Sequence, residues 1–432
     1  MRRRRVLEVV ASVAAVLGAG ALAVPGAVGA WAVPAARGAV PSAGSWRRAI
    51  EVPGLAALNK GGDAKVTSVS CGSAGNCAAG GSYRNRHHHY QGFVASERHG
   101  RWGKAIEVPG RGTLNKGNAR VSEVSCASPG SCGAGGGYTD RRGHGQGFVI
   151  AERDGRWGRA MEVPGLGALN AGGDAGVSSV SCASAGNCTA GGGYTDQDGH
   201  GQGFVAVERN GVWGKAIEVP GLGALNKGGY AAVNSVSCGA AGNCAAGGAY
   251  EDRGQNGQGF VAVEKNGVWG KAIDPPGLRA LNDAAGSPNA EVDSMSCASA
   301  GNCAAVGTYG EPYGTGFVVA EKKGVWGKAI DVGLIGGRLA GANSVSCASA
   351  GNCAAGGFYS DSSGGVTQGW VAVERHGRWG NGIKVPGLRA LNKGGYAAVN
   401  SVSCPLAGSC AAGGYYSGRH HHSQGFVVSQ TG

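Results

Sequence analysis

The stretch Val177-Ser-Ser-Val-Ser-Cys-Ala-Ser-Ala-Gly-Asn-Cys188 decides the fold, because versions of it recur along the whole chain. Each copy ends in two cysteines with five residues between them, and successive copies start 50 to 59 residues apart. The seven pairs are Cys71 with Cys77, Cys126 with Cys132, Cys182 with Cys188, Cys238 with Cys244, Cys297 with Cys303, Cys347 with Cys353 and Cys404 with Cys410. A regular repeat of about this length indicates a solenoid, a propeller or a related array.

One repeat unit contains four expected β-strands. Apolar and small polar residues mix over 177–182, small side chains fill 188–194, and an apolar run covers 203–208. Asn210-Gly211 is a strong hairpin signal, and the fourth strand follows it at 212–219. The unit is therefore a four-stranded antiparallel meander, and radial repetition of such units gives a β-propeller.

The two ends of the repeat region predict how the array closes. Residues 46–52 resemble a lone fourth strand, whereas the last repeat stops after a third strand at 425–429. The N-terminal strand can complete the seventh blade and hide sheet edges that would otherwise be exposed. Seven fourth-strand tryptophans support the number of blades: Trp46, Trp102, Trp157, Trp213, Trp269, Trp326 and Trp379. We expect an all-β, seven-bladed β-propeller of four-stranded antiparallel blades over residues 46–432.

Residues 1–30 have the order of features found in a secretory signal peptide. Four arginines precede an apolar run over 6–24, and small residues follow it. A membrane anchor is the alternative, but Gly and Pro interrupt a run that is near the minimum spanning length of about 17–20 residues. Residues 31–45, rich in Ala, Gly, Pro and Ser, form an expected linker. We expect a secreted or cell-wall-associated monomer with no membrane span after signal cleavage.

Export decides between two interpretations of the cysteine pairs. An oxidising compartment favours disulfides, whereas zinc sites usually place two to four residues between cysteines and have a second ligand pair nearby. Here five residues intervene, and no second pair lies within the repeat. We therefore expect one local disulfide per blade, each contributing about 2–3 kcal/mol in the chain-entropy model. Such links would compensate for second strands of Ala and Gly, which bury little apolar area.

The consensus Ser-Val-Ser-Cys-x5-Cys-Ala-Ala-Gly-Gly-x-Tyr, followed by Gly-Phe-Val-x-x-Glu-x-x-Gly-x-Trp, resembles the exported repeat proteins of high-GC Gram-positive bacteria over residues 46–432. The resemblance implies a propeller-like fold without a defined activity, because most of those proteins are uncharacterised. The turn Asp154-Gly155-Arg156-Trp157 is also similar to part of the Asp-box of sialidase-type propellers. The leading Ser-x-Asp of that box is missing, so the similarity implies no sialidase activity.

The chain is moderately basic, with 39 Lys and Arg against 27 Asp and Glu and a net charge of +12. A basic surface favours contact with acidic partners. The chain carries no nucleic-acid motif and no basic helix, so we expect no nucleic acid partner. For an exported protein an anionic cell-wall polymer is the more natural target. The alternative is that the charge only keeps the surface soluble.

Candidate binding residues recur in the loops between blades. They are Asn59, Lys60, Asn115, Lys116, Asn170, Asn226, Lys227, Asn282, Asn392 and Lys393. Amide and ammonium groups near the mouth of a channel would bind carbohydrate or an anion. The alternative is that Asn shapes a turn while Lys is solvated. The tyrosines that end the second strands and the glutamates of the third strands recur in the same way, and we interpret them as packing residues.

Histidines gather in the loops between second and third strands of the first and last repeats. The two clusters are His87, His88, His89 and His420, His421, His422. Neutral imidazole is a common ligand for zinc, copper or nickel, so the clusters could bind a metal where the seventh and first blades meet. The alternative is a polar loop, because consecutive loop residues rarely share one coordination geometry.

Catalysis requires a unique group of acids, bases or metal ligands, and the conspicuous carboxylates here recur as repeats. The sequence shows no Ser/His/Asp grouping, metal-binding helix motif or phosphate loop. We therefore expect a non-catalytic binding or scaffolding protein without a cofactor. Its loops on one face would recognise a cell-surface glycan, a cell-wall polymer or another extracellular protein. A propeller-type glycosidase, lyase or oxidase, and metal binding by the His-rich loops, are the alternatives.

Overall fold

The computed structural model describes residues 52–73, 75–110, 114–310, 314–332, 339–360, 366–417 and 423–429. All of them belong to one compact unit, Ile50–Gly432. The expected signal peptide, the linker and residues 46–51 of the expected closing strand lie outside the described residues, so they stay predictions. No helix in the described part of the chain is long and apolar enough to cross a membrane.

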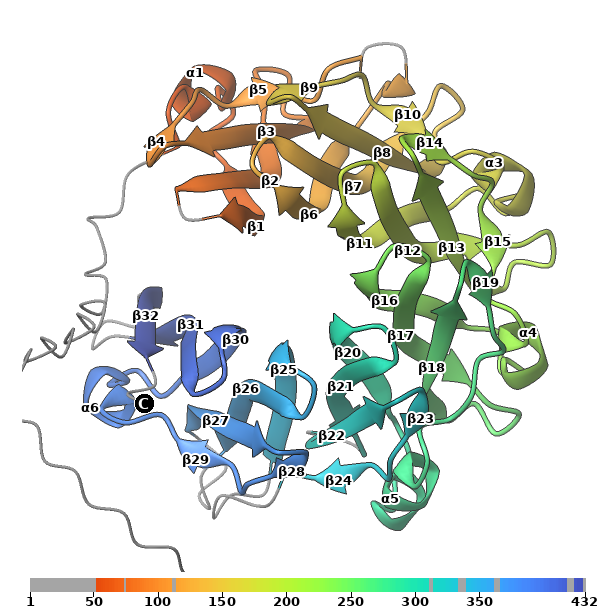
Figure 1. The fold of residues 1–432 in the computed structure, drawn as a ribbon. Helices are drawn as coiled ribbons and strands as arrows, with labels where there is room; N and C mark the ends of the chain where they lie inside the picture. The colour runs from red at the N-terminus through yellow and green to blue at the C-terminus, as the bar shows by residue number, and fades with distance from the viewer. Residues whose placement is uncertain are drawn as a thin grey trace, which may run out of the picture. The chain divides into compact units, whose positions relative to one another are not determined.

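The described strands around each cysteine pair are antiparallel and pair in chain order (Figure 1). A single parallel bridge from Thr315 to Ala340 joins the fifth and sixth repeats into one sheet. The first strands are β1 (Ala64–Ser73), β6 (Ala119–Ser128), β11 (Ala175–Ser184), β16 (Ala231–Ala240), β20 (Glu291–Ser299), β25 (Leu339–Ser349) and β30 (Ala397–Leu406). The second strands are β2 (Asn76–Arg84), β7 (Ser131–Thr139), β12 (Asn187–Thr195), β17 (Asn243–Glu251), β21 (Asn302–Tyr309), β26 (Asn352–Ser360) and β31 (Ser409–Ser417). The third strands are β3 (Tyr90–Arg98), β8 (Gly145–Arg153), β13 (Gly201–Arg209), β18 (Gly257–Lys265), β22 (Thr315–Lys322), β27 (Thr367–Arg375) and β32 (Ser423–Ser429). The all-β repeats predicted from the sequence are confirmed.

The fourth strand differs from the expected continuous strand, because it is divided into two short segments. In the third repeat the Gly214 N–H donates to the Val207 carbonyl oxygen at 2.9 Å between the two segments. The segments are β4 (Arg101–Trp102) and β5 (Ile106–Glu107), β9 (Arg156–Trp157) and β10 (Met161–Glu162), β14 (Val212–Trp213) and β15 (Ile217–Glu218), β23 (Val325–Trp326) and β24 (Ile330–Asp331), and β28 (Arg378–Trp379) and β29 (Ile383–Lys384). The fourth repeat has β19 (Val268–Trp269) and a single bridge from Ile273 to Val261.

Short helices that the sequence did not predict occupy the connections between repeats. They are α1 (Leu55–Leu58), α3 (Leu166–Leu169), α4 (Leu222–Leu225), α5 (Leu278–Ala284) and α6 (Leu388–Leu391). Gly221 precedes α4 with φ 76°, a left-handed conformation that favours glycine. Leu222 then begins the helix and is completely buried. The Pro-Gly-Leu signature of the connection is thus a turn that inserts one leucine into the core.

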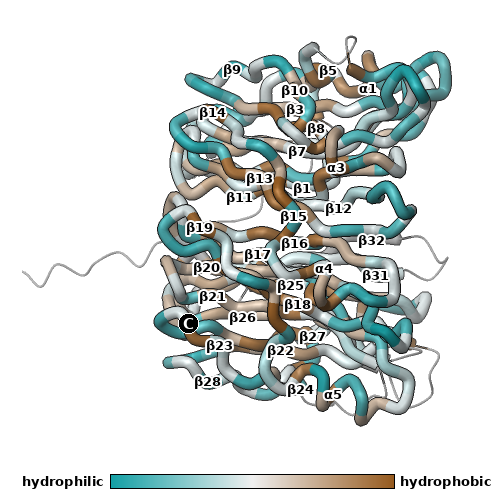
Figure 2. Tube along the Cα trace, turned by 90° about the vertical axis from the view of Figure 1, so that its right-hand side faces the viewer, coloured by the Kyte–Doolittle hydropathy of each residue, from teal (hydrophilic) through white to brown (hydrophobic). Residues whose placement is uncertain are grey.

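Each hydrophobic core lies between two successive sheets. Val205 of β13 packs against Val233, Val236 and Phe260 of the next repeat. The glycines of the second strands allow this close approach: a Cβ at Gly191 would lie 2.6 Å from the Val233 Cγ1 atom. The small side chains therefore set how closely the sheets pack. In Figure 2 the hydrophobic residues follow the middle of the strands, whereas the loops at the two ends are hydrophilic.

The serines of the Ser-Val-Ser-Cys motif join successive first strands, which are the innermost strands in Figure 1. Ser179 and Ser181 of β11 accept hydrogen bonds from the backbone N–H groups of Val236 and Cys238 in β16, both at 3.0 Å. The bond to the cysteine N–H recurs from Ser70, Ser125, Ser237, Ser296 and Ser346 to Cys126, Cys182, Cys297, Cys347 and Cys404. A first strand is a sheet edge, so these hydroxyls supply partners that its own sheet lacks.

All fourteen cysteines form the expected local disulfides, and the predicted pairing is confirmed. The bonds join Cys71 to Cys77, Cys126 to Cys132, Cys182 to Cys188, Cys238 to Cys244, Cys297 to Cys303, Cys347 to Cys353 and Cys404 to Cys410. The two Cα atoms are 3.9 Å apart in six pairs and 4.1 Å apart in the seventh, closer than most facing residues.

The disulfide hairpins lie at one end of the sheets. In the first six repeats the hairpin contacts the turn after the third strand, as in the third repeat, where the Gly211 N–H donates to the Gly186 carbonyl oxygen at 2.8 Å. The connections between repeats and the loops between second and third strands lie at the opposite end. The disulfides are therefore separated from those loops by the length of the strands.

The serine link can be tested within one strand. Ser179→Ala should lower the free energy of unfolding by about 1–3 kcal/mol, because the Val236 N–H loses its partner in a buried position. The neighbouring Ser178 is exposed, and Ser178→Ala should change it by less than about 0.5 kcal/mol. Denaturant unfolding with the disulfides intact measures both. Equal effects of the two variants would contradict the link.

Candidate functional site

A groove with a volume of about 520 Å³ opens at the loop end of the first three repeats. Its lining comes from the ends of strands in the first two sheets and from the start of β11. The polar side chains include Asp63, Lys65, Tyr90, Asn118, Arg120 and Asp174. The groove therefore offers both charges, hydrogen-bonding groups and an aromatic ring to a ligand.

Tyr90 is held at the junction of the first two sheets. Its hydroxyl donates to Asp63 Oδ2 at 2.5 Å, and its backbone N–H donates to Asn118 Oδ1 at 2.9 Å. The hydrogen bond to Asp63, reinforced by the charge of that carboxylate, raises the pKa of Tyr90 above its usual value. The phenol is thus neutral and fixed in position while the side chain remains exposed.

Lys65 and Arg120 occupy equivalent positions on neighbouring first strands, each six residues before the first cysteine of its repeat. Lys65 pairs with Ser82 across the β1–β2 ladder, and Arg120 pairs with Gly137 across the β6–β7 ladder. Both side chains are exposed. Neither makes an ion pair or a side-chain hydrogen bond with any residue that the structure describes, so both charges are available to a ligand.

Three of the groove residues depart from the repeat pattern. The position of Lys65 and Arg120 is non-basic in the other repeats, where it holds Gly176, Ala232, Glu291, Gly341 and Ala398. The position of Tyr90, three residues before the aromatic residue of the third strand, holds Gly145, Gly201, Gly257, Gly314, Thr367 and Ser423 elsewhere. Residues that the repeats share build the fold, whereas these departures converge on one groove. That convergence makes the groove the candidate functional site.

The asparagines that the sequence singled out lie inside the loops. Asn226 is buried, and its Nδ2 atom donates to the Gly201 carbonyl oxygen at 3.0 Å and to Gln202 Oε1 at 3.1 Å. Asn115, Asn170, Asn282 and Asn392 are buried in the same way, and Asn59 accepts a hydrogen bond from the Asp63 N–H. Lys60, Lys116, Lys227 and Lys393 are exposed. None of the ten lines the groove, and their role in binding stays a prediction.

The repeated tyrosines are bonded within the fold. Tyr138 donates to Glu162 and Tyr309 to Asp331, each at 3.0 Å, and burial is the main cause that raises the pKa of both hydroxyls. In the connection between the fourth and fifth repeats, Arg279 joins the pair of Tyr250 and Asp274 and donates to Asp274 at 2.9 Å. These tyrosines pack inside the molecule, as their presence in every repeat indicated.

The structure describes one of the two histidine clusters. His87 and His89 donate their backbone N–H groups to Asn85 Oδ1, which forms a tight turn, and His87 Nε2 accepts from Arg86. His420, His421 and His422 lie outside the described residues, so the expected metal site stays a prediction. Among the residues described, Asp196, Asp198 and His200 are close enough to hold one ion. Both Asp196 oxygens already accept hydrogen bonds that shape that loop.

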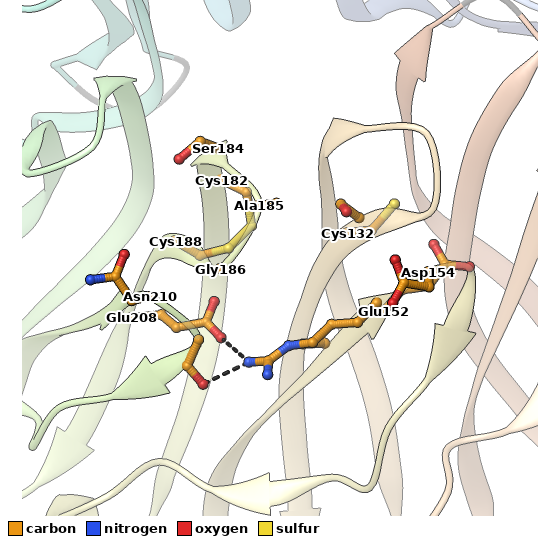
Figure 3. Close-up of a pocket in the computed structure, with 14 residues that line it drawn as sticks. Cys132, Glu152, Asp154, Cys182, Ser184, Ala185, Gly186, Cys188, Glu208 and Asn210 are labelled. Atoms are coloured by element: carbon orange, nitrogen blue, oxygen red, sulfur yellow. Dashed lines mark hydrogen bonds and ion pairs between the residues drawn. A yellow bond between two sulfur atoms is a disulfide. The ribbon is translucent and has the colours of Figure 1, made fainter.

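A second hollow, of about 360 Å³, lies at the disulfide end between the second and third repeats (Figure 3). Arg153 crosses it to donate to Glu208 Oε1 at 3.1 Å and to the Gly211 carbonyl oxygen at 2.6 Å. Burial raises the pKa of Glu208, and the Arg153 charge opposes that shift. Arg209 with Glu264 and Lys322 with Glu374 repeat the arrangement. Because it recurs, we assign this link to the fold.

The cysteines take part in the fold and stay outside the candidate site. Cys132, Cys182 and Cys188 line the second hollow, where the latter two form one disulfide. The other cysteines line neither that hollow nor the groove: Cys71, Cys77, Cys126, Cys238, Cys244, Cys297, Cys303, Cys347, Cys353, Cys404 and Cys410. Their bonded sulfurs are not thiolates that could bind a metal, which agrees with the expectation of disulfides over zinc sites.

Neither a family model nor a curated protein sequence matches the chain. Among solved structures, the GH74 xyloglucanase from Xanthomonas campestris matches 88% of this chain at 12% identity with a TM-score of 0.50. The match covers 55% of that enzyme, so the chain spans about half of its length. At this identity the likeness concerns the fold alone.

Two further structures give TM-scores below 0.5. A PL25 ulvan lyase has 11% identity, a TM-score of 0.46, and coverage of 84% of this chain and 92% of its own. The β-propeller domain of the Trilobed protease from Pyrococcus furiosus has 8% identity, a TM-score of 0.47, and coverage of 85% and 95%. These two likenesses carry no argument, whereas the repeated antiparallel sheets themselves make the described residues an array of β-propeller-like repeats.

Sequence reasoning missed Lys65, Tyr90 and Arg120, because it looked for what the repeats share. A signal was present: aligning the repeats on their cysteines shows two basic residues and one tyrosine at positions where the other repeats carry mostly Gly, Ala or Thr. What the alignment alone lacks is the placement of these positions side by side, which depends on how the first sheet packs on the second.

Proposed function

We propose that the protein is a secreted binding protein that holds a polysaccharide in the groove of its first three repeats. The observation that carries the proposal is the convergence of Lys65, Tyr90 and Arg120 on that groove. Its volume lies in the range of about 300–1,000 Å³ that is usual for ligand sites. An exposed aromatic ring can stack on a sugar, while the surrounding polar groups hydrogen-bond to hydroxyls. Seven disulfides support an oxidising, extracellular environment.

Removal of the aromatic ring tests the proposal. Tyr90→Ala should weaken retention on the preferred polysaccharide by about tenfold, because stacking on an aromatic ring contributes roughly 1.5 kcal/mol. Tyr230 is a suitable control, since it is a half-exposed tyrosine of the same end that does not line the groove. The measurement is affinity electrophoresis or pull-down across a panel of plant, algal and bacterial polymers. The proposal would be overturned if the parent protein were not retained, or if Tyr90→Ala and Tyr230→Ala were retained equally. Cleavage of a polymer would show that the protein is an enzyme instead.

We further propose that the sheets close as a seven-bladed propeller. Val66 and Val69 of β1 are 42% and 55% exposed, whereas the equivalent Val121 and Val124 of β6 are 0% and 3% exposed. The first sheet therefore has an apolar face like those that a preceding sheet covers elsewhere. Ser401 and Ser403 of β30 stand where other repeats carry the serines that bond to the next first strand. Their hydroxyls would accept from the Val69 and Cys71 N–H groups, and strand 46–52 would complete the seventh sheet.

Closure predicts that Val69 behaves as a core residue. Val69→Ala should lower the free energy of unfolding by about 2 kcal/mol, as expected when a buried side chain is truncated. Val212→Ala, at a side chain 72% exposed on a hairpin, should change it by less than about 0.5 kcal/mol. Thermal or denaturant unfolding compares the two. A Val69→Ala variant as stable as Val212→Ala would show that the face stays open.

A further inference from the structure

The charged side chains of the groove differ in whether other residues of the fold contact them. Asp63 accepts a hydrogen bond from the Tyr90 hydroxyl, and Asp174 of the third repeat lies against Gly145 of the second. Lys65 and Arg120 are on the first two sheets and have no such partner in the described chain. Two adjacent cations that the fold leaves unpaired are the kind of group that binds carboxylate, sulfate or phosphate.

We infer, resting on the proposed function, that the polysaccharide is anionic and that Lys65 and Arg120 bind its charged groups. The equivalent positions of the two cations on neighbouring first strands suit a polymer that repeats its charge. Arg120 can bind an oxyanion in a bidentate manner, and Lys65 adds a second point charge. Asp174 and the Thr139 hydroxyl, which also line the groove, remain for neutral sugar hydroxyls.

Polymers that differ only in charge test this inference. The parent protein should bind polygalacturonate at least about tenfold more tightly than its fully methyl-esterified form, since a hydrogen bond to a charged group is worth that much. Comparing chondroitin sulfate with unsulfated chondroitin tests whether sulfate is preferred to carboxylate alone. Wall teichoic acid tests binding to phosphate. Raising the salt concentration from about 0.05 M to about 0.5 M should weaken binding to the acidic polymer, because the charges are exposed and screened.

Lys65→Ala and Arg120→Ala should each remove most of the preference for the acidic form. Lys323→Asn is the matched control, because it also removes one positive charge, and Asn210 and Asn266 hold the same turn with positive φ in other repeats. If the parent protein bound the acidic and neutral forms equally, and Tyr90→Ala lost this binding, the inference would be overturned and the proposed function would stand. Binding of none of the polymers would overturn both.

An independent observation concerns the position four residues before the first cysteine. Thr67, Asn234 and Asn343 occupy it in three repeats, and each donates its side-chain hydrogen to a backbone carbonyl oxygen of the next first strand. The acceptors are Val121, Val292 and Val399, at 2.8, 3.1 and 2.9 Å. In the fifth repeat this position is Asp293, and the equivalent acceptor is the Ala342 carbonyl oxygen. An ionised aspartate has no hydrogen to donate, whereas a protonated one has.

We infer that Asp293 is protonated and donates to Ala342, which makes the junction between the fifth and sixth sheets sensitive to pH. Burial and the negative charge of Glu291 together raise the pKa of Asp293 to about 8. The neighbouring first strands β16 and β25 carry no charged residue. Tyr309, on β21, donates to Asp331. Strands β17 and β18 also pack against β20, and their titratable groups are Tyr250, which donates to Asp274, Glu251, Glu264, which pairs with Arg209, and Lys265. Glu291 is the charged group that raises the pKa of Asp293.

The sign of the effect follows from the two protonation states. The folded protein keeps the Asp293 proton up to about pH 8, whereas the unfolded chain loses it near pH 4. Stability therefore falls as the pH rises from about 4 to about 8, and the Asp293 contribution is constant above that range. Because the two states differ by at most one proton at Asp293, the equilibrium constant for unfolding rises by at most tenfold per pH unit.

Asp293→Asn supplies the hydrogen at every pH. Its stability relative to the parent should grow from about pH 5 to about pH 8, and the infrared band of a protonated carboxylic acid should be lost at neutral pH. Glu291→Gln removes a negative charge near Asp293, so it should lower the pH above which the stability stops falling. Parallel stability curves for the parent and Asp293→Asn, or no change in the infrared band, would overturn the inference.

Discussion

The structure depends on a hydrogen bond between a serine hydroxyl in one first strand and a backbone N–H in the next. The first strand of each sheet has no neighbour on its inner edge, so its polar backbone groups need partners from outside the sheet. Ser181 and its equivalents supply them at successive junctions. The bond acts only if two sheets approach closely, which explains the second strands: at Gly191 even a methyl group would collide with Val233.

Much of the fold is predictable because its causes are local. Period-two patterning, the Asn-Gly turn and the Cys-x5-Cys hairpin each involve residues close in sequence, so the strands, their order and all seven disulfides follow from reading one repeat. The two features that escaped prediction arise from finer backbone geometry. The fourth strand is divided at Gly214, and the connection winds into one turn of helix because Gly221 adopts a left-handed conformation.

The candidate site was harder to predict, because repetition misleads when it is taken as a sign of function. Asn226 recurs because a buried amide in most connections joins the loop to the third strand, here to Gln202 and the Gly201 carbonyl oxygen. Tyr138 recurs because, in the first five repeats, the tyrosine that ends the second strand donates to an acid that follows the third strand. The fold engages the polar atoms of Asn226 and Tyr138 in this way, so these two side chains are poor candidates for binding. The groove residues appear in the sequence only as irregularities, and their proximity depends on packing between sheets.

Two positions of the first strand, separated by one residue, show how the fold leaves room for function. The residue four before the cysteine bonds to the next sheet in three repeats, so a change there alters the junction itself. The residue six before the cysteine makes no such bond from Lys65 or Arg120, and Gly, Ala, Lys, Arg and Glu all occupy it in one molecule. A position with so little structural demand can change charge without cost to stability. Binding specificity can therefore be set at the position six before the cysteine. The serines and the donor four before the cysteine keep the sheets together.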